Sequence, residues 1–169
     1  TFREGQETVI DAILSGQDVL CVMPTGAGKS LCYQVPALMK EGITIVISPL
    51  ISLMKDQVEG LTQSGVSAAY VNSTLAAGQY AKVIQNIRDH RYQLVYVAPE
   101  RLSSSDFLNV CRQVPVSLVI VDEAHCVSQW GQNFSPSYLK IAEFISGLPE
   151  RPTVGAFTAT ATDKVRADI

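Results

Sequence analysis

The stretch Val-Leu-Cys-Val-Met-Pro-Thr-Gly-Ala-Gly-Lys-Ser, residues 19–30, joins a short apolar run to a glycine-rich turn. The run at 19–23 is almost continuously apolar, which is typical of a strand buried on both faces of a parallel sheet. The strict phosphate-binding loop reads G-x-x-x-x-G-K-[ST], and Met23 occupies the position of its first glycine. The other positions agree, so this stretch predicts a strand, a phosphate loop and a helix in succession.

The residue types of this loop suit a bound anion. Gly26 and Gly28 allow backbone N–H groups to converge on a phosphate, and the following helix adds the positive end of its dipole. Lys29 is expected to reach the β- and γ-phosphates of a nucleotide and Ser30 to bind Mg²⁺. The alternative is a plain glycine-rich turn with a chance lysine, which the order strand, loop, helix disfavours. The predicted nucleotide contacts here are Met23, Pro24, Thr25, Gly26, Ala27, Gly28, Lys29 and Ser30.

Short apolar runs rich in Val and Ile recur along the rest of the chain. They lie at 43–47, 66–71, 94–98, 118–121 and 153–157. Helical stripes with i, i+3, i+4 spacing fill the gaps and begin at Val9, Leu50, Tyr80 and Tyr138. Alternating strands and helices predict an α/β fold, a three-layer sandwich around a mainly parallel sheet with right-handed crossovers. Ligands of such folds bind at the carboxyl ends of the strands.

An acidic pair, Asp122 and Glu123, ends the apolar run at 118–121. A carboxylate at the end of a buried strand is costly unless it has a partner or a function. In phosphate-loop proteins an Asp at this place holds Mg²⁺, and Glu123 is then placed to orient or deprotonate the attacking water. The alternative is that the two acidic residues simply lie in the first turn of a helix, where acidic residues are common. We therefore predict Lys29, Asp122 and Glu123 as catalytic residues, and Ser30 with Asp122 as metal ligands.

Composition narrows the class of protein further. The chain has 169 residues, of which 47% are apolar, and a net charge of -3. The apolar fraction excludes a disordered chain, and the net charge excludes a strongly basic protein that coats nucleic acid. A local basic strip can still bind nucleic acid. Four cysteines without a C-x-x-C pair argue against a zinc site and fit the reducing cytoplasm. The longest apolar stretch is too short to span a membrane. One domain, 1–169, is expected, as a fragment of a longer chain.

These motifs together resemble superfamily 2 helicases and, more narrowly, the RecQ family of DNA helicases, over essentially the whole chain. Residues 23–30 resemble motif I, which in this family also lacks the first glycine, and residues 122–125 resemble motif II. Phe2 and Arg3 with Gln6 resemble motif 0, whose glutamine reads the adenine edge. Without the neighbouring motifs, Gln6 would be better explained as an exposed helix residue. The resemblance implies the first RecA-like lobe of a bacterial enzyme, with ATP and Mg²⁺ as cofactors.

Three further motifs imply contacts with DNA. Residues 48–57 resemble motif Ia, residues 98–102 motif Ib and residues 157–162 motif III. The resemblance implies that Lys55 and Arg101 contact the DNA backbone, although each is equally well explained as a solvated charge. Thr158 and Thr160 would link the nucleotide to the DNA side through hydrogen bonds, and their alternative is a helix N-cap.

Residues 126–138 resemble the aromatic-rich loop that RecQ enzymes carry after motif II, which senses single-stranded DNA. Trp130 and Phe134 offer flat faces on which bases can stack, and His125 and Gln129 are expected to couple this loop to the nucleotide. The family pattern His-Asp-Phe-Arg-Pro is changed here. It reads Gln132, Asn133, Phe134, Ser135 and Pro136. The missing arginine at Ser135 weakens the expected coupling between DNA binding and ATP hydrolysis.

The resemblance implies ATP-driven 3′-to-5′ unwinding by the parent protein, in DNA recombination and repair, in the cytoplasm and on the nucleoid. Its expected partners are single-stranded and duplex DNA and a second RecA-like lobe that supplies arginine fingers. An arginine finger is worth roughly 10³–10⁵ in rate, so the lobe alone is expected to hydrolyse ATP very slowly. The alternatives are a DEAD/DEAH-type RNA helicase lobe and a non-catalytic nucleotide-binding module. The intact Lys29, Ser30, Asp122 and Glu123 argue against the second of these.

Overall fold

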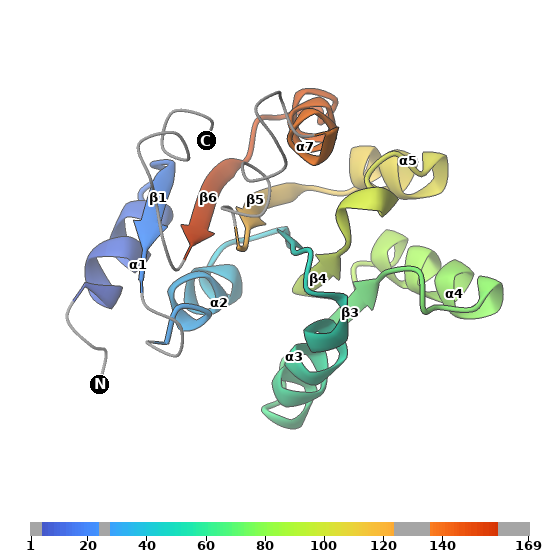
Figure 1. Ribbon diagram of the computed structural model, residues 1–169, viewed down its shortest axis with the longest axis horizontal. Coiled ribbons are helices and arrows are strands. Elements are labelled where there is room, and N and C mark those ends of the chain that lie inside the picture. Colours follow the sequence, from blue (N-terminus) through green and yellow to red (C-terminus); the bar gives the residue numbers. More distant parts are fainter. Residues whose placement is uncertain (1–4, 24–27, 124–135, 159–169) are drawn as a thin grey trace.

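Six strands form one parallel sheet in the order β1-β6-β5-β2-β4-β3 in the computed structural model, which describes residues 5–23, 28–123 and 136–158 (Figure 1). The strands are β1 (Val19–Val22), β2 (Ile43–Ile47), β3 (Ala68–Val71), β4 (Leu94–Val97), β5 (Val116–Val121) and β6 (Thr153–Thr158). Every strand pair of this sheet is parallel. The predicted α/β class is confirmed, and the observed strand ends lie within two residues of the predicted ones.

Helices cover both faces of the sheet and complete the predicted three layers (Figure 1). One face carries α1 (Gln6–Leu14), α2 (Leu31–Met39) and α3 (Ile51–Gln63). The other face carries α4 (Ala77–Arg88), α5 (Ser105–Gln113) and α7 (Pro136–Ser146), with the short 3₁₀ turn η1 (Pro99–Arg101) before α5. In the described part of the chain no helix has the length and apolar character needed to cross a membrane.

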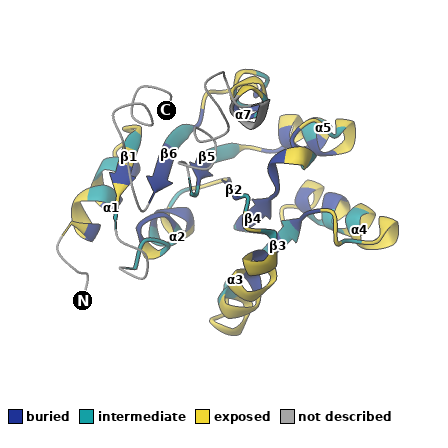
Figure 2. Cartoon of the chain, in the orientation of Figure 1, coloured by how far each residue is buried: buried dark blue, intermediate teal, exposed yellow. Residues whose placement is uncertain are grey.

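The central strands β2 and β4 are buried on both faces, as their continuous apolar runs predict. The same prediction is wrong for the edge strand β1, where Leu20 and Val22 are 39% and 43% exposed. Along β2, Ile45 and Ile47 join the core under α4, α5 and α7, whereas Val46 between them joins the core under α1, α2 and α3. Figure 2 shows the same division, with dark strands between helices whose outer faces are exposed. Because both faces of the sheet are covered, polar side chains reach solvent mainly at the strand ends.

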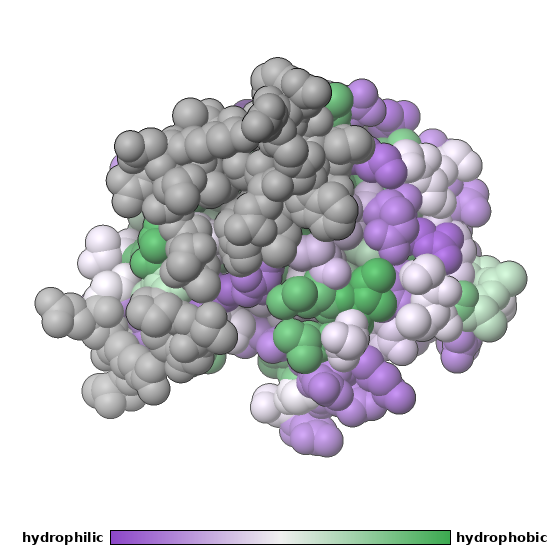
Figure 3. Space-filling view, viewed as in Figure 1, coloured by the Kyte–Doolittle hydropathy of each residue, from purple (hydrophilic) through white to green (hydrophobic). Residues whose placement is uncertain are grey.

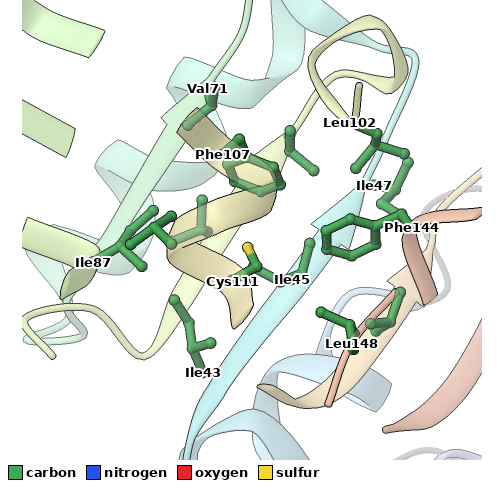
Figure 4. Packing of buried hydrophobic residues seen from close by; sticks show 14 of the residues in the cluster. Ile43, Ile45, Ile47, Val71, Ile87, Leu102, Phe107, Cys111, Phe144 and Leu148 are labelled. Carbon is green, nitrogen blue, oxygen red and sulfur yellow. The ribbon is translucent and has the colours of Figure 1, made fainter. Parts of the chain in front are cut away.

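The core under α5 contains a pair of aromatic rings that the helical stripes did not predict (Figure 4). Phe107 of α5 stacks on Phe144 of α7 with ring centroids 5.8 Å apart. Cys111 lies one turn further along α5 and is buried in the same cluster. The predicted helical stripes did not include α5, although Phe107, Val110 and Cys111 form a buried apolar face on it.

An ion pair at the amino ends of the strands holds the edge strand β1 beside β6. Asp18 precedes β1, and its carboxylate accepts hydrogen bonds from Arg151 at 3.1 and 2.6 Å. The backbone N–H of Val154 in β6 donates to the same carboxylate at 2.9 Å. The hydrogen bond from Arg151 holds the pKa of the Asp18 carboxyl below its ordinary value of 3.8, although partial burial opposes it.

Asp18→Asn should therefore lower the free energy of unfolding at neutral pH, and this difference from the wild type should shrink in acid. A lowered pKa means that the pairing stabilises the fold above pH 3.8 and is lost as the pH falls through the folded value. Both side chains are about half exposed or more, so we expect a loss of no more than about 1 kcal/mol. Urea unfolding of the chain at pH 7, 5 and 3.5 would measure it. Asp11→Asn, on the exposed side of α1, is the matched control, and an equal loss at all three pH values would contradict the prediction.

Candidate nucleotide site

The predicted phosphate loop and the predicted acidic pair meet at the carboxyl ends of β1 and β5, with β6 between them. The Lys29 ammonium, just before α2, lies 3.1 Å from Oδ1 of Asp122 and 2.5 Å from Oε1 of Glu123. Parallel strands end at the same edge of a sheet, which is why residues so far apart in the chain converge. The structure thus brings together the three residues predicted to be catalytic.

This cluster is largely shielded from solvent. The Lys29 side chain is 11% exposed and those of Asp122 and Glu123 are 16% exposed. Burial alone would lower the pKa of Lys29, but the hydrogen bond to Glu123 and the attraction of Asp122 outweigh it, so the pKa of Lys29 is raised. Burial raises the pKa of Asp122, against the opposing pull of Lys29. With one cation between two carboxylates, the site carries one net negative charge at neutral pH.

The backbone fixes the direction of both carboxylates. The Asp122 N–H donates to the Ile47 carbonyl at 2.8 Å, which continues the pairing of β5 with β2 one residue past the strand. Glu123 then takes a left-handed conformation with φ 54°, and its N–H donates to Oδ1 of Asp122 at 3.0 Å. A non-glycine residue seldom adopts this conformation, and such strain concentrates at functional sites. Here it turns two consecutive side chains toward the same lysine.

The glutamine predicted to read adenine contacts the phosphate loop. Gln6 is the first residue of α1, is buried, and donates from Nε2 to the Gly28 carbonyl at 3.0 Å. Gly28 itself has φ +75°, and a Cβ there would lie only 2.3 Å from Gln6 Nε2. Only glycine therefore fits under this glutamine. The contact places α1 at the site, whereas the adenine contact itself stays a prediction.

Beside the cluster lies an open hollow of about 360 Å³ between Lys29, the acidic pair and the start of α3. Its far wall includes Leu50 and Leu53, which are 37% and 48% exposed. Figure 3 shows a hydrophobic area over this part of the molecule. Ser30 and Ser48 also line the hollow. The predicted motif Ia segment therefore borders the predicted nucleotide site.

The predicted DNA contacts that the structure describes differ in their surroundings. Lys55 on α3 is exposed and forms a long ion pair, 3.9 Å, with Glu59. Arg101 in η1 lies over the Tyr80 ring, 5.1 Å from the ring centroid, so the Arg101 guanidinium packs on this ring. Thr158 ends β6, is buried, and its carbonyl accepts from the Met23 N–H at 3.0 Å. Thr158 thus links the end of β6 to Met23, which follows β1 directly at the start of the phosphate loop.

Several predicted site residues lie outside the described residues. These are Phe2, Arg3, Pro24, Thr25, Gly26, Ala27, His125, Gln129, Trp130, Gln132, Asn133, Phe134, Ser135 and Thr160.

The oxygen atoms near Lys29 are of the kind that binds Mg²⁺. Ser30 and Asp122 line the same hollow and offer one hydroxyl and one carboxylate oxygen. Mg²⁺ prefers oxygen ligands and usually takes one or two from the protein, with waters and phosphates completing its shell. Among the described residues no cluster of three or more His, Cys, Asp or Glu side chains forms a metal site. The residues present thus fit a Mg²⁺ ion shared with a nucleotide.

Sequence reasoning missed the polar residues beneath the acidic pair. Tyr33 and Tyr96 are buried side by side, with hydroxyl oxygens 3.3 Å apart, and Gln34 donates to Tyr96 at 3.1 Å. A signal for Tyr96 was present, since a tyrosine in a valine-rich buried strand needs a partner for its hydroxyl. The partner of the Tyr96 hydroxyl depends on how α2 packs on the sheet. A local sequence pattern does not predict this packing.

Comparison with known proteins gives these motifs a family. The model of the DEAD/DEAH box helicase family matches residues 3–169. The ATP-dependent DNA helicase RecQ of Bacillus subtilis (strain 168) is 49% identical over 99% of this chain, and that of Haemophilus influenzae is 46% identical over all of it. The chain spans only 29% and 27% of the length of these two relatives.

Solved structures agree on the fold. A hypothetical ATP-dependent RNA helicase from Sulfolobus tokodaii superposes with a TM-score of 0.77 at 24% identity, over 99% of this chain and 49% of that one. The DUF1998 helicase MrfA bound to DNA superposes with a TM-score of 0.80 at 17% identity, over 99% of this chain and 26% of that one. At such identities the likeness shows the shared helicase-lobe fold and nothing finer.

The close approach of Gln6 and Gly28 predicts a non-additive pair of substitutions. Gly28→Ala should cost about 1–3 kcal/mol from its left-handed backbone alone, and more from the clash with Gln6. In a Gln6→Ala background the clash is absent, so the same change should cost less. Unfolding free energies of the two single variants and the double variant test this. Equal costs of Gly28→Ala in both backgrounds would show that the two residues do not contact each other.

Proposed function

Because this chain belongs to the DEAD/DEAH box helicase family, we propose that residues 1–169 are one domain, the ATP-binding RecA-like lobe of a RecQ-type DNA helicase. The observation that carries the proposal is the placing of Lys29 between Asp122 and Glu123 at the carboxyl ends of the strands. In a phosphate-loop site these three groups are the parts that phosphoryl transfer needs.

The roles follow from charge and position. Lys29 is a buried cation at the start of α2, where the phosphates of ATP would meet it and the loop N–H groups. Ser30 and Asp122 would hold Mg²⁺, which supplies positive charge to the β- and γ-phosphates when bound. Glu123 would orient the attacking water and accept its proton. Gln6 would position the adenine end of the site through its contact with the loop.

The DNA side of the lobe is proposed to lie next to this site. Lys55 is exposed on α3, close along the helix to the exposed Leu50 and Leu53. Lys55 and Arg101 would follow phosphates, Trp130 and Phe134 would stack on bases, and His125, Gln129, Thr158 and Thr160 would couple them to the nucleotide. Single-stranded and duplex DNA are the proposed ligands, with 3′-to-5′ unwinding by the parent protein. Both relatives quoted above are named as DNA helicases.

A second lobe is part of the proposal because the chain spans less than a third of those relatives. In such motors ATP lies in the cleft between two lobes, and the second lobe supplies arginine fingers. The proposed reaction therefore needs the parent protein. The proposed setting, DNA recombination and repair on the bacterial nucleoid, follows from the RecQ relationship alone.

The parent protein should hydrolyse ATP faster in the presence of single-stranded DNA than of RNA of the same length. Lys29→Ala should abolish this activity, because it removes the cation that meets the phosphates and leaves two adjacent carboxylates unpaired. Lys82→Ala, on the exposed side of α4, should retain it. The ATPase activity of the wild type and of the two variants is measured as phosphate release. Stimulation by RNA alone would favour the RNA-helicase alternative, and nucleotide binding without hydrolysis would favour the binding module.

The 169-residue lobe by itself should hydrolyse ATP about 10³-fold or more slowly than the parent protein, with or without DNA, because the proposal assigns the arginine fingers to the second lobe. Single-turnover phosphate release from the two proteins at equal concentration gives the ratio. DNA-stimulated turnover by the lobe at the rate of the parent would show that it carries the complete active site.

A further inference from the structure

A tyrosine and an arginine meet at the carboxyl ends of the neighbouring strands β3 and β4, outside the nucleotide site. Tyr80 lies at the start of α4, the helix that follows β3, and Arg101 ends η1, which follows β4. Because β3 and β4 are parallel, both segments begin at the same edge of the sheet. The guanidinium carbon of Arg101 lies over the Tyr80 ring, 5.1 Å from the ring centroid. This distance is within the range of a cation–π interaction.

The fold holds the Tyr80 ring in place. Its hydroxyl oxygen lies 2.7 Å from Oγ of Ser104, in the turn between η1 and α5. The N–H of Ser104 in turn donates to the Arg101 carbonyl at 3.1 Å. The backbone N–H of Tyr80 donates to the Ala76 carbonyl at 2.9 Å, and the ring packs against the core under α4, α5 and α7. The surface on which the guanidinium lies is therefore fixed before any ligand binds.

A backbone carbonyl holds the guanidinium from a second side. Arg101 Nη2 donates a long hydrogen bond, 3.4 Å, to the carbonyl of Asn72, which follows β3 directly. Asn72 is 1% exposed, and its Oδ1 accepts a hydrogen bond from the Thr74 N–H at 2.9 Å. A side chain that bonds the backbone two residues later forms a local turn and fixes the chain there. The ring and the carbonyl thus hold the Arg101 side chain at the edge of the sheet.

The charge of Arg101 is not neutralised within the described part of the chain. The ion pairs found there involve Lys29, Lys55 and Arg151, and no carboxylate pairs with Arg101. Arg101 is nevertheless half-buried. A half-buried cation without a counter-ion is costly, and an apolar side chain would pack on the ring without that cost. The arrangement therefore indicates that Arg101 binds an anion that is not part of the described chain.

The geometry suits a phosphate group. A guanidinium is planar, so stacking on a ring occupies its face and leaves the N–H groups at its edge for a bidentate contact with phosphate oxygens. An arginine loses side-chain freedom when it binds a ligand, and this loss lowers the affinity. Arg101 has less freedom to lose because the ring and the carbonyl already hold it. Tyr80 can therefore raise the affinity for a phosphate that it does not itself touch.

We propose that Tyr80 is a positioning residue, which with the Asn72 carbonyl holds the Arg101 guanidinium ready to bind a phosphate of a single DNA strand. The inference rests on the proposed function, since Arg101 is one of the DNA contacts proposed there. Tyr80 itself lies between the segments that resemble motifs Ia and Ib and belongs to neither. Substitution of Tyr80 should therefore change the affinity for DNA only while Arg101 is present.

The test measures binding of fluorescein-labelled oligo-dT to the full-length parent protein by fluorescence anisotropy at several KCl concentrations. Arg101→Ala should weaken binding about tenfold, the size expected for a hydrogen bond to a charged group. It should also make the slope of log affinity against log salt shallower by about 0.7, which corresponds to one phosphate contact on a single strand. Tyr80→Leu should weaken binding about threefold and leave the slope unchanged. In the Arg101→Ala background, Tyr80→Leu should have no further effect.

Two further variants keep either the ring or the charge. Tyr80→Phe retains the ring and should bind DNA more tightly than Tyr80→Leu. Arg101→Lys retains the charge without the planar fork, so it should keep the salt slope and still lose affinity. Tyr92→Leu is the matched control for the tyrosine, because Tyr92 is also half-buried but precedes β4, at the amino ends of the strands. Arg88→Ala, at the last residue of α4, is the matched control for the arginine. Both controls should bind DNA as the wild type does.

The outcomes separate the inference from the proposed function. Wild-type affinity of Tyr80→Leu or of Arg101→Lys would overturn the inference and leave the proposed function intact. An equal loss from Tyr80→Leu in both backgrounds would do the same, because it would not depend on Arg101. An unchanged salt slope in Arg101→Ala would show that Arg101 meets no phosphate, which also overturns the inference. Wild-type protein that binds no oligo-dT would overturn the proposed DNA binding and the inference with it. Thermal unfolding of each variant verifies that it is folded.

Discussion

The ion pairs of Lys29 with Asp122 and Glu123 tie the start of α2 to the end of β5, and the remainder of the site is arranged around them. Two adjacent carboxylates in a poorly solvated place repel each other, so a nearby cation favours the state in which both are charged. Lys29 supplies this cation, and the two carboxylates in turn raise its pKa. Removal of Lys29 would leave the two carboxylates without a cation, which explains why the phosphate loop and the acidic pair have to be considered as one unit.

The sequence predicted the strands well because their signal is local. Continuous apolar runs placed β2 without error, and β1 and β4 to within one residue, although β1 exposes Leu20 and Val22. The phosphate loop and Asp122 were predicted for a similar reason, as each directly follows such a run. The prediction failed for α5, although its buried residues lie on one face. It also failed where the signal is not local, because the link between Asp18 and Arg151 joins β1 to its neighbour β6, and pattern alone does not give this adjacency.

The site's polar support could not be predicted for a further physical reason. The partner of the Tyr96 hydroxyl is fixed by the rotation of α2 about its own axis when it packs on the sheet, and this rotation depends on all the side chains between them. Gln6 is a second residue whose contact could not be predicted from the local sequence. From sequence it had an exposed alternative, yet it is buried against Gly28 because the loop glycine leaves room for its amide. In both cases a local pattern identifies the residue type but not its contact.

The contrast between the two cores bears on how the lobe works. The core under α4, α5 and α7 contains the stacked Phe107 and Phe144 and lies on the face of the sheet away from α1, α2 and α3. The core under α1, α2 and α3 includes the tyrosine pair and borders both the nucleotide site and the exposed start of α3. Polar groups in a core cost stability unless they are bonded, and their bonds allow few arrangements. The contact of the Tyr33 and Tyr96 hydroxyls and the bond from Gln34 to Tyr96 therefore limit how α2 can lie on the sheet beside the nucleotide site.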